Sequence, residues 1–123
     1  MLDLIIKNGQ CHIDGQLKNI DIAIKDGKIE KIGKILEETK DTINAKGLMV
    51  LPGCIDTQTH FREPGSTDTE DLNSGSRAAV VGGITSVFEM PNTNPPTSTK
   101  NEFQKKLDLA KNRMYCNYAF YFG

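Results

Sequence analysis

Short runs in which apolar and polar residues alternate fill the first fifty residues, and turn signals separate them. An apolar segment at 4–6 is followed by Asn-Gly at 8–9, and residues 20–24 read Ile-Asp-Ile-Ala-Ile. Asp-Gly at 26–27 is a strong signal for a two-residue hairpin turn, because such turns need positive φ. Alternation of this period gives a sheet one polar face. We therefore predict a small antiparallel β unit over residues 1–50.

The pattern changes its period after residue 50. It predicts a strand at 50–59, a helix at 70–82, a β-branched strand at 84–90, a helix at 100–113 and a third strand at 116–122. Strands that alternate with helices at this spacing predict parallel βαβ units. The second half is therefore expected to be an α/β structure.

Local signals define the ends of both predicted helices. Glu70 and Asp71 are expected in the first turn of the first helix, where acidic side chains interact favourably with the helix dipole. The glycine pair at 82–83 ends that helix. Ser98 or Thr99 is expected to cap the second helix.

Polar side chains follow an apolar run, residues 48–51, near the end of the first strand of the second half. Because side chains alternate along a strand, Asp56, Gln58 and His60 are predicted to share one face. Three polar side chains at the end of a buried strand require a metal ion, a substrate or a hydrogen-bond network as a partner.

Composition excludes several classes of function. The 123 residues include 15 basic and 16 acidic side chains, which argues against binding to nucleic acid or to an anionic membrane. No apolar run approaches the roughly 18 residues that span a bilayer. The N-terminus lacks the features of a signal peptide, so we expect a cytoplasmic protein. The three scattered cysteines are expected to be free thiols.

Three parallel strands and two helices leave a sheet incomplete. A (β/α)8 barrel takes about 250 residues, so we expect this chain to be the front part of a longer protein. The alternative is a complete small α/β domain with a β cap.

Two motifs carry a resemblance to a known family. The segment 52–65, which includes His-Phe-Arg-Glu-Pro-Gly at 60–65, resembles the first barrel strand and loop of dihydroorotases in the amidohydrolase superfamily. Met-Pro-Asn-Thr-Asn-Pro at 90–95 resembles the loop after their second strand. The resemblance implies that residues 1–50 are the N-terminal part of a β-sandwich and that residues 51–123 are the first βαβαβ section of a TIM-like (β/α)8 barrel.

The activity implied by this resemblance is that of a ring hydrolase. Dihydroorotases interconvert N-carbamoyl-L-aspartate and dihydroorotate, a small anionic substrate, in pyrimidine (UMP) biosynthesis. They hold one or two divalent metals, commonly zinc. The general base and the remaining metal ligands would lie beyond Gly123, so no catalytic residue is assigned within these residues, and the fragment alone is expected to be inactive. The full-length protein is expected to be a homo-oligomer.

The resemblance assigns the metal-binding positions to the first strand. His60 matches the second histidine of the family's Asp-x-His-x-His motif, and Gln58 stands where the first histidine should be. A carboxamide is a weak ligand for zinc, so an altered metal site is expected. Asp56 precedes this pair. It either orients a neighbouring side chain or makes a plain hydrogen bond at the strand end.

Arg62 and Asn92 match the residues with which the family grips the substrate carboxylate. A guanidinium presents a planar fork of donors, and a carboxamide adds two more. The alternatives without a binding role are that Arg62 pairs with Glu63 or Asp71, and that Asn92 only forms a turn. Both residues follow strand ends, so βαβ topology is expected to bring them close to His60.

Two other functions are compatible with the residues. Hydantoinases, dihydropyrimidinases and allantoinases share the fold and the cyclic-amide chemistry, but their substrates lack the ring carboxylate that Arg62 and Asn92 would bind. A catalytically silent homologue that serves as a scaffold for aspartate transcarbamoylase would explain Gln58.

Overall fold

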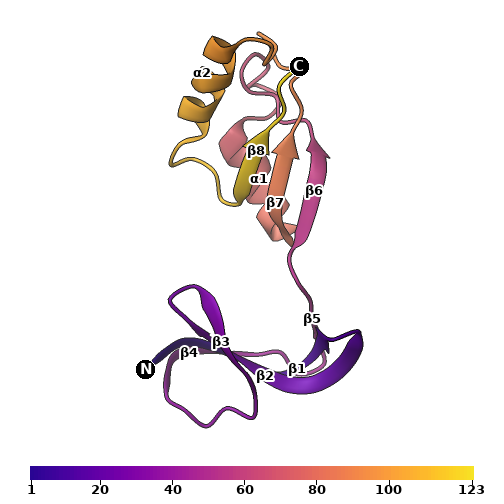
Figure 1. Cartoon of the computed structure of the whole chain (residues 1–123), viewed down its shortest axis with the longest axis vertical. Helices are drawn as coiled ribbons and strands as arrows, with labels where there is room; N and C mark the ends of the chain where they lie inside the picture. The colour runs from indigo at the N-terminus through magenta and orange to yellow at the C-terminus, as the bar shows by residue number, and fades with distance from the viewer. The chain divides into compact units, whose positions relative to one another are not determined.

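The computed structural model describes residues 1–123, which divide into two compact units (Figure 1). The N-terminal unit is Met1–Pro52 and the C-terminal unit is Gly53–Gly123. Each has its own cluster of buried apolar residues.

The N-terminal unit is a five-stranded sheet. Its strands are β1 (Leu2–Ile13), β2 (Gln16–Lys25), β3 (Lys28–Gly33), β4 (Thr39–Asn44) and β5 (Met49–Val50). The order is β3-β2-β1-β4, and β5 also pairs with β1. Hairpins make β1, β2 and β3 antiparallel, whereas β4 and β5 run parallel to β1. The prediction of a purely antiparallel unit is wrong here, because β4 crosses to the free edge of β1 instead of forming a hairpin with β3.

Asp-Gly pairs form the two tight turns of this sheet. Asp26 and Gly27 have φ of 50° and 72°, as a two-residue hairpin of the predicted kind requires. Asn8, predicted to lie in a turn, is instead part of an irregularity within β1: its φ is 63°, and the register with β2 shifts between Ile6 and Gly9. A bulge accommodates the left-handed residue while the strand continues.

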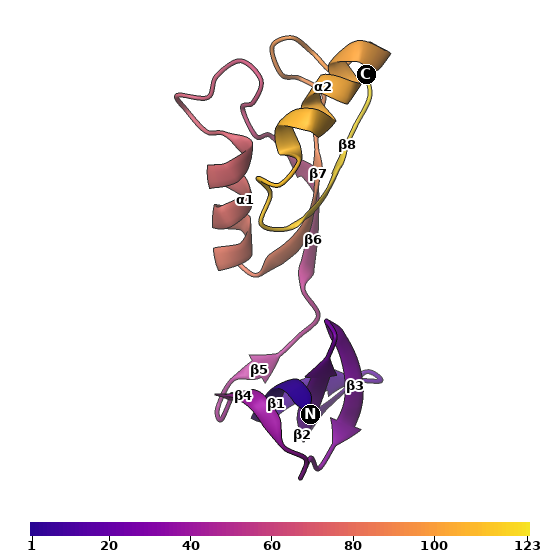
Figure 2. The same ribbon diagram turned by 90° about the vertical axis from the view of Figure 1, so that its left-hand side faces the viewer.

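The C-terminal unit contains three parallel strands and two helices. Its elements are β6 (Cys54–Thr59), α1 (Leu72–Val81), β7 (Ile84–Glu89), α2 (Lys100–Ala110) and β8 (Asn117–Phe120). The sheet order is β6-β7-β8 and both pairings are parallel. The predicted βαβαβ arrangement is confirmed, and Figure 2 shows α1 lying beside these strands.

The core of the C-terminal unit lies between the sheet and the helices. Val87 at the centre of β7 is fully buried against Leu72 of α1, Ala110 of α2 and the rings of Phe61 and Phe120. Burial of each such side chain contributes about 1.5–3 kcal/mol relative to exposure. This face of β7 therefore fixes both helices on the same side of the sheet.

Several element ends differ from the prediction. The strand expected at 50–59 is two strands, because Pro52 has no N–H for a ladder and the chain breaks there. Asp71 is not in the first turn of α1 but caps it, accepting a hydrogen bond from the Ser74 N–H within a capping box. Thr99 caps α2 in the same way as predicted, and α2 ends at Ala110.

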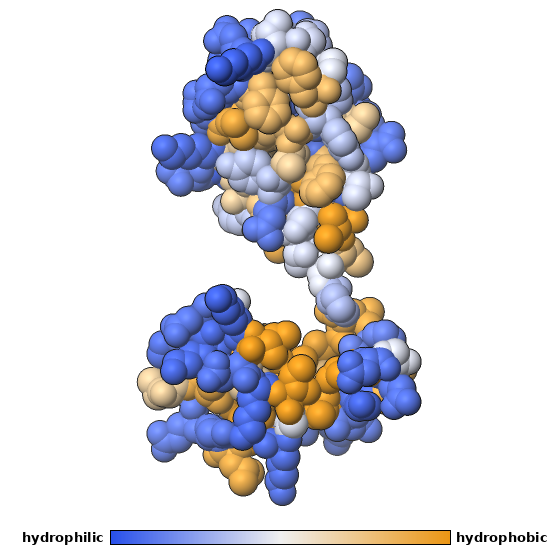
Figure 3. Space-filling model, in the orientation of Figure 1, coloured by the Kyte–Doolittle hydropathy of each residue, from blue (hydrophilic) through white to orange (hydrophobic).

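The strand β6 was predicted to be buried and is mostly exposed. It is the edge strand of its sheet, paired only with β7, and Thr59 alone is buried. Ile55, Phe88 and Tyr121 are also exposed apolar residues of this unit. Figure 3 shows the apolar side chains at its surface.

Candidate functional site

The pairing of β6 with β7 determines how the polar residues of β6 are presented. Asp56 pairs with Val87 and Thr59 pairs with Glu89, so three steps along β6 match two along β7. Val87 and Glu89 share the face that carries the helices, and the bulge therefore places Asp56 and Thr59 on that face too. The predicted single row of Asp56, Gln58 and His60 is interrupted. Asp56 instead accepts a hydrogen bond from the Gln58 backbone N–H at 2.9 Å.

His60 and Asn92 lie together at the carboxyl ends of β6 and β7. The distance from His60 Nδ1 to Asn92 Oδ1 is 3.0 Å, and both side chains are exposed. With the amide in this orientation, Asn92 Oδ1 accepts a hydrogen bond from the Nδ1–H of the imidazole. Asn92 thus sets the ring orientation of His60, as partners of functional histidines commonly do.

Arg62 is exposed and its charge is not used in an ion pair. The carboxylates that the sequence offered as partners, Glu63 and Asp71, both interact with Arg113 instead. The guanidinium of Arg62 is near enough to Glu89 to favour its ionised form. Within these residues the Arg62 guanidinium thus forms no salt bridge.

The loops that carry Arg62 and Asn92 touch each other. The Asn94 N–H donates to the Pro64 carbonyl at 3.0 Å. Gly65 has a φ of +121°, and a Cβ there would lie 2.8 Å from Asn94 Cβ. Only glycine suits both the backbone conformation and the close approach.

We expect Gly65→Ala to destabilise the protein more than Gly83→Ala. Gly83 also has positive φ (+84°), but a Cβ there meets nothing within 4 Å. The shared strain costs roughly 1–2 kcal/mol, and the clash with Asn94 should add a similar amount for Gly65→Ala alone. Urea denaturation of both variants measures the difference, and equal losses of stability would contradict the contact between the loops.

A partly buried ion pair that sequence reasoning missed holds the Arg62 loop. Glu63 is 7% exposed and accepts from Arg113 Nη1 at 2.7 Å and Nη2 at 2.9 Å. Its Oε2 also accepts from the Leu72 N–H at 3.0 Å, at the start of α1. The bidentate pairing with Glu63 raises the pKa of Arg113. The only sequence signal for this pair was the position of Glu63 inside the motif at 60–65.

A second buried pair, also missed, lies under the Asn92 loop. Glu89, the last residue of β7, and Lys106 of α2 are both almost fully buried and form an ion pair. The Lys106 ammonium also donates to the Met90 carbonyl at 3.3 Å and to the hydroxyls of Thr93 and Thr97 at 3.3 and 3.2 Å. Neither Glu89 oxygen has a hydrogen-bond donor in good geometry, so the Lys106 charge is its main compensation.

Burial raises the pKa of Glu89 to about 7, because the loss of hydration outweighs the attraction of Lys106, His60 and Arg62. The folded pKa lies above the ordinary value of 4.5, so protonated Glu89 favours the folded state below pH 4.5, and this contribution is lost as the pH rises to about 7.

We therefore expect wild-type stability to fall relative to Glu89→Gln, which cannot titrate, as the pH rises from 4.5 to 7. The expected change in the difference between the two free energies of unfolding is about 3 kcal/mol. Denaturant titrations of both proteins at pH 4.5, 6 and 8 measure it. A constant difference across this range would contradict the raised pKa.

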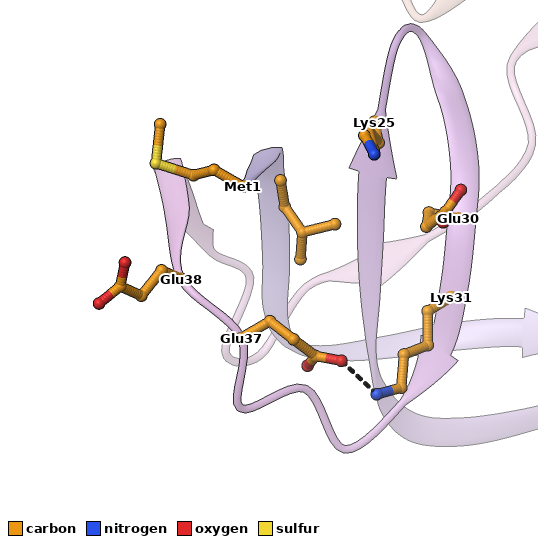
Figure 4. Close-up of a pocket in the computed structure, with 7 residues that line it drawn as sticks. Met1, Lys25, Glu30, Lys31, Glu37 and Glu38 are labelled. Atoms are coloured by element: carbon orange, nitrogen blue, oxygen red, sulfur yellow. Dashed lines mark hydrogen bonds and ion pairs between the residues drawn. The ribbon is translucent and has the colours of Figure 1, made fainter.

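The N-terminal unit has a concavity lined by charged side chains of both signs (Figure 4). Lys31 Nζ and Glu37 Oε1 are 2.5 Å apart, and the hydrogen bond from Lys31 lowers the pKa of Glu37. Both side chains are about half exposed, so the pair is an ordinary surface ion pair. Its side chains are not arranged for catalysis.

Comparison with known proteins places the site in a family. A sequence profile described as the Amidohydrolase family matches residues 49–123, which is more than half of the chain and includes both polar strand ends. The chain belongs to the amidohydrolase family. This confirms the family-level prediction and the expected fold class.

Named amidohydrolases match most of this chain. It is 45% identical over 113 residues to an allantoinase of Escherichia coli O1:K1 and 46% identical to one of Salmonella choleraesuis, in each case over 91% of this chain and 25% of the relative. The L-hydantoinase (dihydropyrimidinase) of Arthrobacter aurescens superposes with a TM-score of 0.89 at 35% identity, over 100% of this chain and 28% of that one. The chain thus spans about a quarter of its relatives' length. A dihydroorotase in particular stays a prediction.

Members of the amidohydrolase family typically depend on divalent metals. In this chain no group of three or more His, Cys, Asp or Glu side chains comes together. His60 and Gln58 supply one imidazole and one carboxamide, which do not make up a zinc site. The residues of this amidohydrolase chain therefore do not form a metal centre by themselves, and the assignment of His60 and Gln58 as ligands stays a prediction.

The last two features predicted from the sequence are the state of the cysteines and the lack of a membrane-spanning segment. Cys11, Cys54 and Cys116 are all free, as expected. No helix has both the length and the apolar character needed to cross a membrane.

Proposed function

We propose that this chain is part of a hydrolase that opens a cyclic amide, of the type represented by its allantoinase and hydantoinase relatives. The observation that carries the proposal is the 45% identity to allantoinase over 113 residues, which includes both polar strand ends. A structural likeness at 35% identity to an L-hydantoinase supports the same class of substrate. In this proposal, the activity belongs to the full-length protein and requires residues that follow Gly123.

The residues of this chain would bind and orient the ring. Arg62 would bind a carboxylate or carbonyl oxygen, since its guanidinium is exposed and free of an ion pair. Asn92 would donate to the same group through its amide nitrogen while its oxygen remains in contact with His60. The free Nε2 of His60 would face the reacting centre, and Gln58 would lie beside it.

Dihydroorotase is the second candidate, and one observation favours it. An unpaired cation on a loop that touches the loop of a carboxamide suits dihydroorotate, whose ring carries a carboxylate, better than the uncharged rings of hydantoin or allantoin. In this case the full-length enzyme would interconvert dihydroorotate and N-carbamoyl-L-aspartate.

A third candidate is a silent homologue that binds aspartate transcarbamoylase. Gln58 favours it, because a carboxamide at a histidine position weakens zinc binding. The free Arg62 argues against it, since a scaffold does not need an unpaired substrate-binding cation.

One experiment separates the three candidates. The chain is expressed within its full reading frame, its bound metal is measured, and hydrolysis of allantoin, hydantoin and dihydroorotate is assayed in parallel. Turnover of allantoin or hydantoin supports the main proposal, and turnover of dihydroorotate alone supports the second. A folded protein without turnover of any of the three would overturn both and leave the scaffold.

A further inference from the structure

The buried ammonium of Lys106 is joined to a single segment, the Asn92 loop (residues 90–97), and to the residue before it. Lys106 is 1% exposed, and its four partners are Glu89, Met90, Thr93 and Thr97. Burying a lysine is unfavourable unless its charge is paired and its donors are satisfied. Glu89 at the end of β7 supplies the counter-charge, the Phe120 ring lies 5.3 Å from the ammonium, and the hydrogen-bond acceptors all belong to the loop. One side chain thus ties α2 to the loop.

The Asn92 loop is also held by backbone hydrogen bonds to its neighbours: the Met90 N–H donates to the Thr59 carbonyl at 2.9 Å, the Asn94 N–H to the Pro64 carbonyl at 3.0 Å, and the Gly123 N–H to the Thr97 carbonyl at 3.1 Å. Lys106 adds the hydrogen bonds that come from α2. Pro91, Pro95 and Pro96 have no N–H to donate, and the internal backbone hydrogen bonds include those from the Thr93 and Thr97 N–H groups to the Pro91 carbonyl, both at 2.9 Å. Lys106 binds the loop at its beginning, through Met90, and at its end, through Thr97.

Asn92 lies between the points that Lys106 holds. Its side chain is exposed and does not contact Lys106, but its Oδ1 is 3.0 Å from His60 Nδ1. Displacement of the loop would therefore move Asn92 and release the His60 ring. The positions of Asn92 and the His60 ring would decide whether a bound substrate is held in a reactive arrangement.

We propose that Lys106 is a positioning residue, which holds the Asn92 loop so that Asn92 meets His60 and the substrate. This role deepens the function proposed above and rests on it. Lys106 acts through the loop and touches no reacting atom.

The test removes the tie while preserving the fold. Lys106→Met alone would leave Glu89 buried without a counter-charge, so it is combined with Glu89→Met, because replacing both partners by apolar groups is often close to neutral for stability. Lys105→Met is the matched control: Lys105 is the preceding residue, and its side chain is 59% exposed and paired with Glu102.

Kinetics and hydrogen exchange are measured on the full-length protein. We expect the double variant to stay folded, to raise KM for the hydrolysed ring substrate about tenfold or more, and to speed amide exchange of Thr93 and Thr97 at least tenfold, while Lys105→Met changes neither. A folded double variant with wild-type KM and wild-type exchange would overturn the proposal.

Two further measurements test the proposal if the double variant does not fold or if wild type is inactive. If the double variant does not fold, Thr93→Val combined with Thr97→Val removes two acceptors and leaves the ion pair in place, and a severalfold rise in KM and exchange is expected. If wild type hydrolyses none of the ring substrates, the proposed function fails, and the exchange rates alone still decide whether Lys106 holds the loop.

Discussion

Replacing Arg62 with methionine should lower kcat/KM for a carboxylate-bearing ring substrate by more than 100-fold. The guanidinium makes no ion pair within the chain, so its charge is available to a ligand, and loss of one partner of a charge-assisted contact costs about 3 kcal/mol. Steady-state kinetics with dihydroorotate measure the effect. The loss should appear mainly in KM if the contact is made equally in the ground state and the transition state.

The matched control for this prediction is Arg77→Met. Arg77 is exposed on α1 and, like Arg62, forms no ion pair, but it lies away from the strand ends. Its replacement should leave kcat/KM unchanged. If Arg62→Met behaves like Arg77→Met with dihydroorotate, Arg62 does not bind the carboxylate. If allantoin is the substrate, the loss should be smaller, since that ring has no carboxylate.

Replacing Glu63 with alanine should produce a large loss of stability. It removes a bidentate ion pair with Arg113 and leaves the Leu72 N–H without its acceptor. Breaking a buried pair from one side costs about 3–5 kcal/mol, and the partial exposure of Arg113 lowers our expectation to about 2–3 kcal/mol in the free energy of unfolding. Urea denaturation of the two proteins measures it.

Two companion variants show whether the ion pair is responsible. Lys105→Met disrupts the exposed pair with Glu102 and should cost less than about 1 kcal/mol. Glu63→Met combined with Arg113→Met should recover part of the loss, because neither partner then stays buried without its counterpart. A double variant as unstable as the sum of the two single variants would contradict the pairing.

Both buried pairs take their cation from the same region of the chain. Lys106 lies on α2 and Arg113 follows it, and their carboxylate partners Glu89 and Glu63 lie at the ends of β7 and β6. The second helix and the residues just after it thus hold the two loops that carry Arg62 and Asn92. If these loops bind the ring substrate as proposed, a substitution in this segment would affect binding without touching the substrate.

The candidate site could be predicted only in part. His60, Arg62 and Asn92 were found because polar side chains at strand ends and a family motif mark them, and parallel topology predicts that such ends converge. Glu63 and Arg113 are 50 residues apart in the sequence, and nothing local indicates that they meet. In the sequence, Lys106 looks like an ordinary polar residue on the exposed face of a helix. It is buried only because the Asn92 loop folds over it.

The local sequence determined the elements of this protein, because the period of apolar positions, the capping residues and the Asp-Gly turns act over a few residues. That was enough for the βαβαβ order, the hairpin at 26–27 and the helix caps. Only the tertiary structure decided the parallel return of β4 and the bulge that separates Asp56 from His60. Each of these depends on which strands and loops become neighbours, and that is settled by packing between distant segments.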